Sequence, residues 1–183
     1  SGEPFEFELG DRYVHSLITG MTGSGKTNMM FVIAQSFAGW YSPNDANFCF
    51  IGEKDEFRLF GGLPHTLVTA SNDEGYEKVF SILDKELDQR RKLFLDANVV
   101  DYKSFREKCS DEKLPRIIVF IDELLSLQKD IYSKPYFRQL GELIRVSRSY
   151  GFHFILSTQG PSHIGERIIN NIQSRFVFRC VHE

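Results

Sequence analysis

The sequence predicts one three-layer α/β domain over residues 1–183, with a mainly parallel central sheet. Three observations support this fold class. Short runs rich in β-branched and aromatic residues alternate with segments of helical periodicity, which is the order of a parallel sheet with helices on both faces. A glycine-rich turn joins the first such run to the first helical segment. The 183 residues, 42% hydrophobic and 26% charged, suit a single globular unit.

The expected strands, in chain order, cover residues 13–19, 48–51, 67–69, 117–121, 152–157 and 175–181. The expected helices cover residues 27–40, 72–95 and 137–150, with shorter helical pieces at 124–128 and 164–172. Pro43 lies in the turn after the first helix, where a helix breaker belongs, and Gly151 closes the third helix. The fourth strand is apolar throughout, as expected of a strand that is buried on both faces.

Composition narrows the classes of function. A formal net charge of −3 gives no global attraction to nucleic acid, so any DNA contact would need a local patch. The three cysteines are widely spaced and the five histidines are scattered, which indicates a reducing compartment and no structural metal. No apolar stretch approaches the roughly 20 residues needed to cross a bilayer. The chain is therefore expected to be cytoplasmic, or to be the cytoplasmic part of a membrane-anchored protein.

A phosphate-binding motif follows the first expected strand. Residues 20–27 read GMTGSGKT and fit GxxxxGK[ST] at every fixed position, between a strand and a helix as the motif requires. Glycines let backbone N–H groups point at phosphates beside the positive end of a helix. Lys26 would reach the outer phosphates of ATP, and the Thr27 hydroxyl would coordinate Mg²⁺. The residues expected to bind ATP are Gly20, Met21, Thr22, Gly23, Ser24, Gly25, Lys26 and Thr27. The alternative is a chance glycine-rich turn.

An acidic pair, Asp122 and Glu123, follows the fourth expected strand. The carboxyl end of a strand in an open α/β sheet is where ligands bind, and we expect this strand to neighbour the first. Asp122 would hold Mg²⁺, directly or through water, and Glu123 would polarise the attacking water. The alternative is an acidic cap and first turn for the helical piece that follows, with no part in catalysis.

Polar residues also end the fifth expected strand, at Ser157, Thr158 and Gln159. Gln159 would sense the terminal phosphate or orient water, and a plain polar loop is the alternative. Arg145, Arg148 and Arg175 are candidates for an arginine finger offered to a neighbouring subunit, or else solvated surface residues. The basic run at residues 89–92 could meet phosphates of a polymer, although basic residues late in a helix also complement its dipole, and we favour that second interpretation.

In combination these motifs resemble the motor domain of the FtsK/SpoIIIE family, ring-forming ATPases of the RecA-like, additional-strand class. The resemblance runs from the phosphate-binding loop to the end of the chain. It is carried by residues 17–27, 63–65, 86–94, 117–123, 147–153, 157–161 and 171–175. It implies ATP hydrolysis with Mg²⁺ in a homo-oligomeric ring, a hexamer in this family, and it favours Arg148 as the residue acting in trans.

Two features depart from the family pattern. The family usually has Asp followed closely by Lys after its second strand, whereas this chain has Gly52, Glu53 and Lys54, so the role of that Asp is in doubt here. The family domain also continues past the last strand expected here, which indicates a fragment of a longer protein. Within the family, translocases move double-stranded DNA and type VII secretion ATPases move proteins. The resemblance favours DNA as the polymer, with a protein substrate as the alternative.

Overall fold

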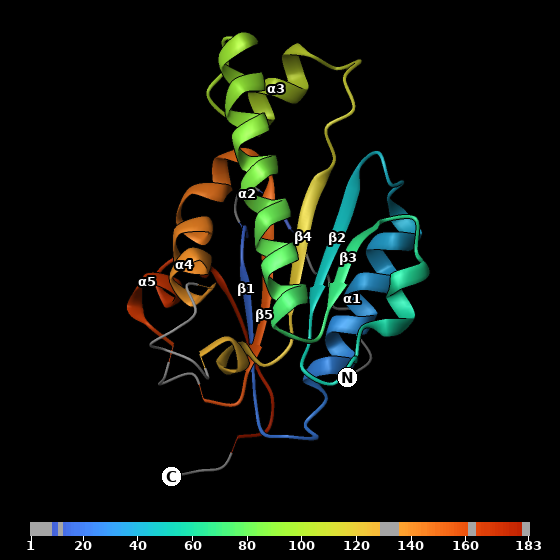
Figure 1. The fold of residues 1–183 in the computed structure, drawn as a ribbon, viewed down its shortest axis with the longest axis vertical. Coiled ribbons are helices and arrows are strands. Elements are labelled where there is room, and N and C mark those ends of the chain that lie inside the picture. Colours follow the sequence, from blue (N-terminus) through green and yellow to red (C-terminus); the bar gives the residue numbers. More distant parts are fainter. Residues whose placement is uncertain (1–8, 11–12, 129–135, 161–163, 181–183) are drawn as a thin grey trace, which may run out of the picture.

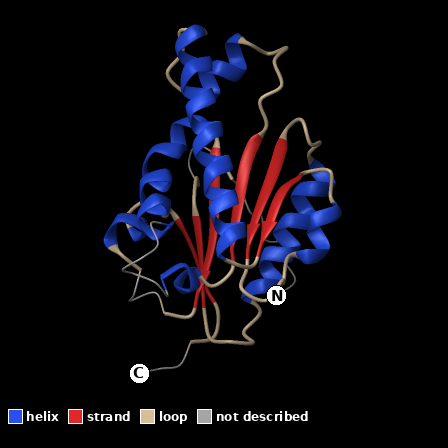
Figure 2. Cartoon of the chain, viewed as in Figure 1, coloured by secondary structure: helices blue, strands red, loops and turns tan. Residues whose placement is uncertain are grey.

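The computed structural model describes residues 9–10, 13–128, 136–160 and 164–180 of the chain. Six strands in this part form one sheet in the order β3-β2-β4-β5-β1-β6, and every pairing in it is parallel. Their bounds are β1 Ser16–Thr19, β2 Ala46–Ile51, β3 Thr66–Ala70, β4 Arg116–Ile121, β5 Phe152–Thr158 and β6 Ser174–Val177. The predicted α/β class with a parallel sheet is confirmed (Figure 1, Figure 2).

Helices cover both faces of the sheet and complete three layers. Helix α1 (Lys26–Trp40) and the 3-10 helix η1 (Arg58–Gly62) pack on one face. Helices α2 (Asp73–Asp96), α4 (Tyr136–Ser147) and α5 (Glu166–Ile169) pack on the other (Figure 1). The alternation of side chains along a strand divides the core in two: in β4, Val119 faces α2 and α4, whereas Phe120 faces α1. A strand buried on both faces needs the unbroken apolar run that β4 has.

The order of strands corrects one expectation. The strand that carries the acidic pair, β4, does not neighbour β1, because β5 lies between them and pairs with both. The registers Ile121↔Leu156 and Thr19↔Thr158 bring the ends of all three strands to one edge. We call this the carboxyl edge, and we call the opposite end of the sheet, where the strands begin, the amino edge.

Several element bounds differ from those expected. The expected first strand is shorter at its start, since β1 begins at Ser16, and the last, β6, ends at Val177. The long helix before Gly151 ends at Ser147 and continues as the 3-10 helix η3 (Arg148–Tyr150). The piece at Leu124–Gln128 is the 3-10 helix η2. Residue 181, at the end of the last expected strand, lies outside the described residues.

The charged stretch after α2 contains a helix that the sequence did not predict. Helix α3 (Tyr102–Lys108) is preceded by its N-cap Asp101, whose side chain accepts a hydrogen bond from the Ser104 N–H. Tyr102 and Phe105, three residues apart, are buried with Phe94 in a small separate core at the amino edge. The helix is seven residues long and rich in charged residues, so the sequence has too few turns there to show a helical periodicity.

The residues of the basic run 89–92 are not all exposed. Arg90 is fully buried, with 1% of its side chain exposed, and it donates hydrogen bonds to the carbonyls of Tyr150 and Pro115, both at 2.6 Å. It also forms an ion pair with Glu86 at 2.8 Å. Arg90 therefore joins α2 to the segments that lead into β4 and β5. For this residue the interpretation as a contact with the phosphates of a polymer was wrong.

No helix in the described part of the chain combines the length and apolarity that a membrane span requires.

Candidate functional site

Residues 20–27, which we call the phosphate loop, run from the end of β1 into the first turn of α1 at the carboxyl edge. Gly20 has φ +156° and Gly25 has φ +105°, and a Cβ on Gly20 would lie 2.7 Å from both the Phe178 Cβ and the Ser24 Oγ. The Met21 N–H donates to the Arg179 carbonyl at 2.9 Å, which ties the loop to the segment after β6. Glycine at position 20 is thus required by contact with Phe178 and by the turn itself.

The amino end of α1 is an uncompensated positive end. Its N-cap is Gly25, which has no side chain to accept from the first N–H groups, and its first turn carries no acidic residue. Backbone N–H groups and the helix dipole then remain available to an anion. The Ser24 Oγ is buried beside them and has no hydrogen-bond partner among the described residues. This set of donors fits the phosphates of a nucleotide.

Lys26 is held over the loop in which it lies. It is 7% exposed, and its Nζ donates to the carbonyls of Gly20 at 2.8 Å and Met21 at 3.0 Å. Carbonyl oxygens are weaker partners for an ammonium group than phosphate oxygens, because the latter carry full charge. The ammonium group is therefore placed where phosphates would take over its hydrogen bonds.

Thr27 and Asp122 meet directly across the site. The Thr27 hydroxyl donates to Asp122 Oδ2 at 2.6 Å, and the Ser157 hydroxyl donates to Asp122 Oδ1. A hydroxyl and a carboxylate side by side at the end of a phosphate loop are oxygen ligands of the kind that Mg²⁺ prefers. The pair expected from the sequence to hold Mg²⁺ is thus brought together by the fold.

Glu123 has an unusual backbone and a well-placed side chain. Its φ of 58° lies in the left-handed region, which non-glycine residues rarely adopt. Its N–H donates to the Ser157 hydroxyl at 3.0 Å, and its Oε1 accepts from the Thr158 hydroxyl at 3.3 Å. Its Oε2 is buried without a hydrogen-bond partner among the described residues. An oxygen of this kind, next to the phosphate loop, can accept a hydrogen bond from a water molecule.

The alternative interpretation of the acidic pair, as a helix cap, finds no support in these contacts. Among the described residues, the side chains of Asp122 and Glu123 accept from the hydroxyls of Thr27, Ser157 and Thr158. The described contacts include no hydrogen bond from the N–H groups of η2 to either carboxylate, which a cap would receive.

Gln159 also reaches the phosphate loop. Its Oε1 accepts a hydrogen bond from the Thr22 hydroxyl at 2.7 Å, across 137 positions of sequence. The last two residues of β5 and the residue after it therefore each contact a different part of the site: Ser157 contacts Asp122, Thr158 contacts Glu123, and Gln159 contacts Thr22.

The arginines expected to act in trans lie elsewhere. Arg148 is exposed in η3, just before β5, and so lies at the amino edge, with the length of β5 between it and the phosphate loop of its own chain. Arg145 forms an ion pair with Glu142 at 3.1 Å on the surface of α4. Arg175 donates to the Ile169 carbonyl at 3.2 Å on the edge strand β6. The structure does not bring any of the three to the carboxyl edge of its own chain.

Ser157 is the contributor that sequence reasoning left without a role. The pairing of β4 with β5 is the signal that finds it, because the register Ile121↔Leu156 places the next residues, Asp122 and Ser157, opposite each other. That register is a property of the sheet and is not visible in the sequence.

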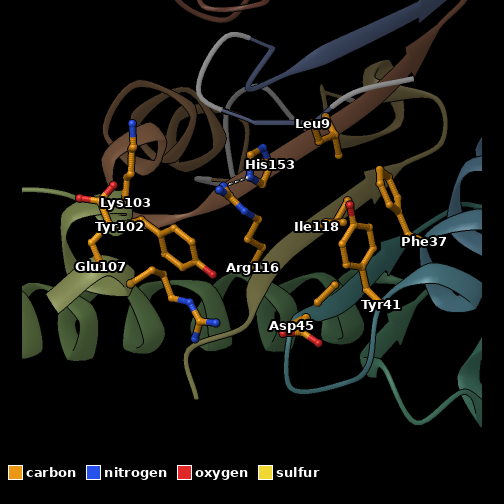
Figure 3. Close-up of a pocket in the computed structure, with 12 residues that line it drawn as sticks. Leu9, Phe37, Tyr41, Asp45, Tyr102, Lys103, Glu107, Arg116, Ile118 and His153 are labelled. Carbon is orange, nitrogen blue, oxygen red and sulfur yellow. Dashed lines mark hydrogen bonds between the residues drawn. The ribbon is translucent and has the colours of Figure 1, made fainter. Parts of the chain in front are cut away.

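The amino edge holds a cavity of about 470 Å³, far from the phosphate loop (Figure 3). Its lining includes residues at or near the starts of β2, β4 and β5, among them Ala46, Arg116 and His153. The Arg116 guanidinium donates to His153 Nε2 at 2.9 Å and lies over the Tyr102 ring, 4.5 Å from its centroid (Figure 3). Two other lining side chains donate to backbone carbonyls outside the cavity lining: Tyr102 to Leu114 at 2.7 Å and Arg106 to Glu112 at 2.9 Å.

Two buried histidines at this edge are neutral. His153 Nδ1 donates to the Val14 carbonyl while its Nε2 accepts from Arg116, and burial together with the Arg116 charge lowers its pKa to about 3. His15 Nδ1 accepts from the Phe154 N–H at 3.1 Å, so that Nε2 donates to the Ile144 carbonyl. Burial lowers the pKa of His15 to about 4.

The model of the FtsK/SpoIIIE family matches residues 1–182. A DNA translocase FtsK from Caldanaerobacter subterraneus subsp. tengcongensis is 32% identical over 170 residues, which cover 90% of this chain and 24% of that protein. The type VII secretion system protein EssC of Staphylococcus aureus (strain NCTC 8325) is 31% identical over 158 residues, which cover 82% of this chain and 10% of EssC. The chain thus spans about a quarter of the length of one relative and a tenth of the other.

Among solved structures, the cytoplasmic domain of EssC superposes with a TM-score of 0.84 at 26% identity, over 93% of this chain and 34% of that one. The fold is that of RecA-like P-loop ATPase domains, in agreement with the sheet order described above.

Proposed function

This chain belongs to the FtsK/SpoIIIE family, and we propose that it is an ATP-binding and ATP-hydrolysing motor domain that works with Mg²⁺. The observation that carries the proposal is the hydrogen-bonded set at the carboxyl edge. Thr27 meets Asp122 at 2.6 Å, and Glu123 keeps a buried oxygen without a partner in the described residues beside them. Phosphate loop, metal ligands and base are the parts that phosphoryl transfer to water requires.

The residues divide the work by position. The backbone N–H groups at the start of α1, and those of the loop that have no partner within the described residues, bind the phosphates. Lys26 exchanges its two loop carbonyls for the outer phosphates and neutralises charge there. Thr27 and Asp122 would hold Mg²⁺, which would neutralise charge on the phosphate oxygens. Glu123 Oε2 orients and polarises the attacking water. Gln159 reports the state of the loop through Thr22.

The Lys26→Ala variant tests the nucleotide site. Removing the ammonium group should lower ATP affinity at least ~100-fold, because charge-assisted hydrogen bonds to phosphate are lost. Lys85→Ala, an exposed lysine on α2, is the matched control and should bind ATP as the wild type does. Isothermal titration gives the affinities, and circular dichroism checks that both variants are folded. Unchanged ATP affinity in Lys26→Ala would refute the assignment.

For assembly we propose a homo-oligomeric ring, hexameric as the family resemblance implies. The placement of Arg148 supports a contact between subunits. An exposed arginine at the amino edge does not reach the phosphates of its own chain, so any catalytic role it has must be toward a neighbour. We assign it as the finger that stabilises charge in the transition state.

For the polymer we propose double-stranded DNA first, on the relation to DNA translocase FtsK over nine-tenths of the chain. A net charge of −3 provides no global attraction to DNA, so the contact must come from loops that face the channel of the ring. Binding of this kind is non-specific and weakens steeply with salt, because phosphate contacts release counterions.

A protein substrate is the second candidate, and the structural similarity to the cytoplasmic domain of EssC favours it. A protein substrate would be recognised through a pocket or groove, with weak salt dependence. The discriminating measurement is the ATPase rate of the assembled full-length protein with and without double-stranded DNA at two salt concentrations. Salt-sensitive stimulation supports DNA as the polymer, and a flat response at both salt concentrations supports protein secretion.

A further inference from the structure

One buried hydroxyl connects the metal carboxylate to the backbone of the base. Ser157 is completely buried at the end of β5. Its Oγ donates to Asp122 Oδ1 and accepts the N–H of Glu123 at 3.0 Å. A serine hydroxyl has one proton to donate, and here that proton is used on Asp122. The two contacts therefore fix the orientation of the hydroxyl and leave the Glu123 N–H satisfied.

The second contact matters because the backbone of Glu123 is strained. A non-glycine residue at φ 58° is in an unfavourable conformation that persists only where its surroundings hold it. The bond from its N–H to Ser157 is one such restraint, and the bonds from the Thr158 hydroxyl to its Oε1 and from the Ser126 N–H to its carbonyl are two more. With these in place, Oε2 remains as the oxygen of Glu123 without a partner in the described residues.

We propose that Ser157 is a positioning residue for ATP hydrolysis, which sets the backbone of Glu123 so that Oε2 points at the attacking water. The proposal rests on the proposed function, since it needs Glu123 to act as the base. Ser157 does not touch the nucleotide or the water. It acts through Glu123, and its bond to Asp122 keeps base and metal ligand in a fixed relation.

The test is the Ser157→Ala variant of the assembled full-length protein. Without the hydroxyl, the Glu123 N–H loses its acceptor and the left-handed conformation loses a restraint, so the base is oriented for a smaller fraction of the time. We expect kcat to fall ~10-fold or more, while KM for ATP stays within about threefold, because nothing that binds phosphate has changed. Asp122 also loses a hydrogen bond, so the Mg²⁺ concentration for half-maximal rate should rise, but saturating Mg²⁺ should not restore kcat.

Ser16→Ala is the matched control. Ser16 is likewise completely buried, in the neighbouring strand β1, and its Oγ has no partner among the described residues. Removing that hydroxyl should leave kcat, KM and thermal stability near those of the wild type. If Ser157→Ala fails to fold, Ser157→Cys has nearly the same size but a weak donor, and the same fall in kcat at constant KM is expected of it.

A double-mutant cycle with Glu123→Gln identifies the route of action. If Ser157 works through Glu123, Ser157→Ala should slow the Glu123→Gln protein by less than about twofold. Additive losses in the double variant, a loss that saturating Mg²⁺ reverses, or a wild-type kcat in Ser157→Ala would each overturn the proposal. A wild-type protein that does not hydrolyse ATP would instead refute the proposed function, so the two failures are distinct.

Discussion

The groups at the phosphate loop differ from two buried histidines of the amino edge in how their polar atoms are used. At the carboxyl edge, Lys26 is held by loop carbonyls and Glu123 keeps an oxygen without a partner among the described residues, on a strained backbone. At the amino edge, both ring nitrogens of His15 and of His153 are used in hydrogen bonds. Burial of ionisable groups does not by itself distinguish a catalytic site from a structural one. Unused hydrogen-bonding capacity combined with strain does.

The two edges would not have separate roles if Arg148, at the amino edge of one subunit, acted on nucleotide bound at the carboxyl edge of the next subunit. Arg148→Ala should lower the ATPase rate of the assembled protein by ~10³-fold, about 4 kcal/mol of transition-state stabilisation. Mixing Arg148→Ala subunits with Lys26→Ala subunits should restore turnover, because some interfaces then combine an intact Arg148 with an intact phosphate loop. If turnover is not restored although the mixture assembles to the same extent, Arg148 is a solvated surface residue with no role in trans. Arg145→Ala, on the exposed face of α4, should keep the wild-type rate.

Removing Arg90 tests the structural character of the amino edge. Arg90→Ala leaves the carbonyls of Tyr150 and Pro115 without their buried donor, and the free energy of unfolding should fall by roughly 3 kcal/mol. Urea unfolding measures this loss. Arg91→Ala removes an exposed ion pair with Asp88 on the same helix and should change stability by less than about 1 kcal/mol. Similar losses from both variants would contradict the buried role of Arg90.

The Glu123→Gln variant sharpens the other side of the comparison. It keeps the size of the side chain and removes its charge, so turnover should fall ~10²-fold, about 2.7 kcal/mol, while ATP stays bound. Single-turnover kinetics and nucleotide affinity, measured on the same sample, separate the two quantities. A wild-type rate would leave Glu123 as an acidic residue at the start of η2. The free energy of unfolding should not fall, because the substitution removes no buried hydrogen bond on which the fold depends.

Mild acid should lower the free energy of unfolding through the two buried histidines of the amino edge. The pKa values of His15 and His153 are lowered in the folded state to about 4 and about 3, below the ordinary value of 6.5. The unfolded chain therefore binds protons first as pH falls below about 6.5, and each histidine lowers the free energy of unfolding by up to about 1.4 kcal/mol per pH unit until its folded pKa is reached. Urea unfolding between pH 7 and pH 5, above the main range of carboxylate titration, measures the effect. A constant free energy of unfolding over that range would contradict it.

The parts of the site that the sequence predicts are those whose signal is local. The loop of residues 20–27 has a motif, and Asp122 and Glu123 follow an apolar strand directly. Ser157 depends on the register of β5 against β4, which sequence periodicity does not report. Arg90 was misjudged although a signal existed, because it lies at helical spacing between Leu87 and Phe94 on the buried face of α2. No residue pattern in the chain specifies which polymer the proposed motor would act on.

The contact between the phosphate loop and the segment after β6 has a mechanical consequence. Phe178 is bonded through its N–H to the Thr19 carbonyl at 2.8 Å and packs against Gly20, and Arg179 accepts the Met21 N–H. Tension applied to the chain beyond Arg179 is therefore delivered to the loop itself within two residues, before it spreads into the sheet. The same bonds would transmit a change in loop shape, on phosphate binding or release, to the segment after β6.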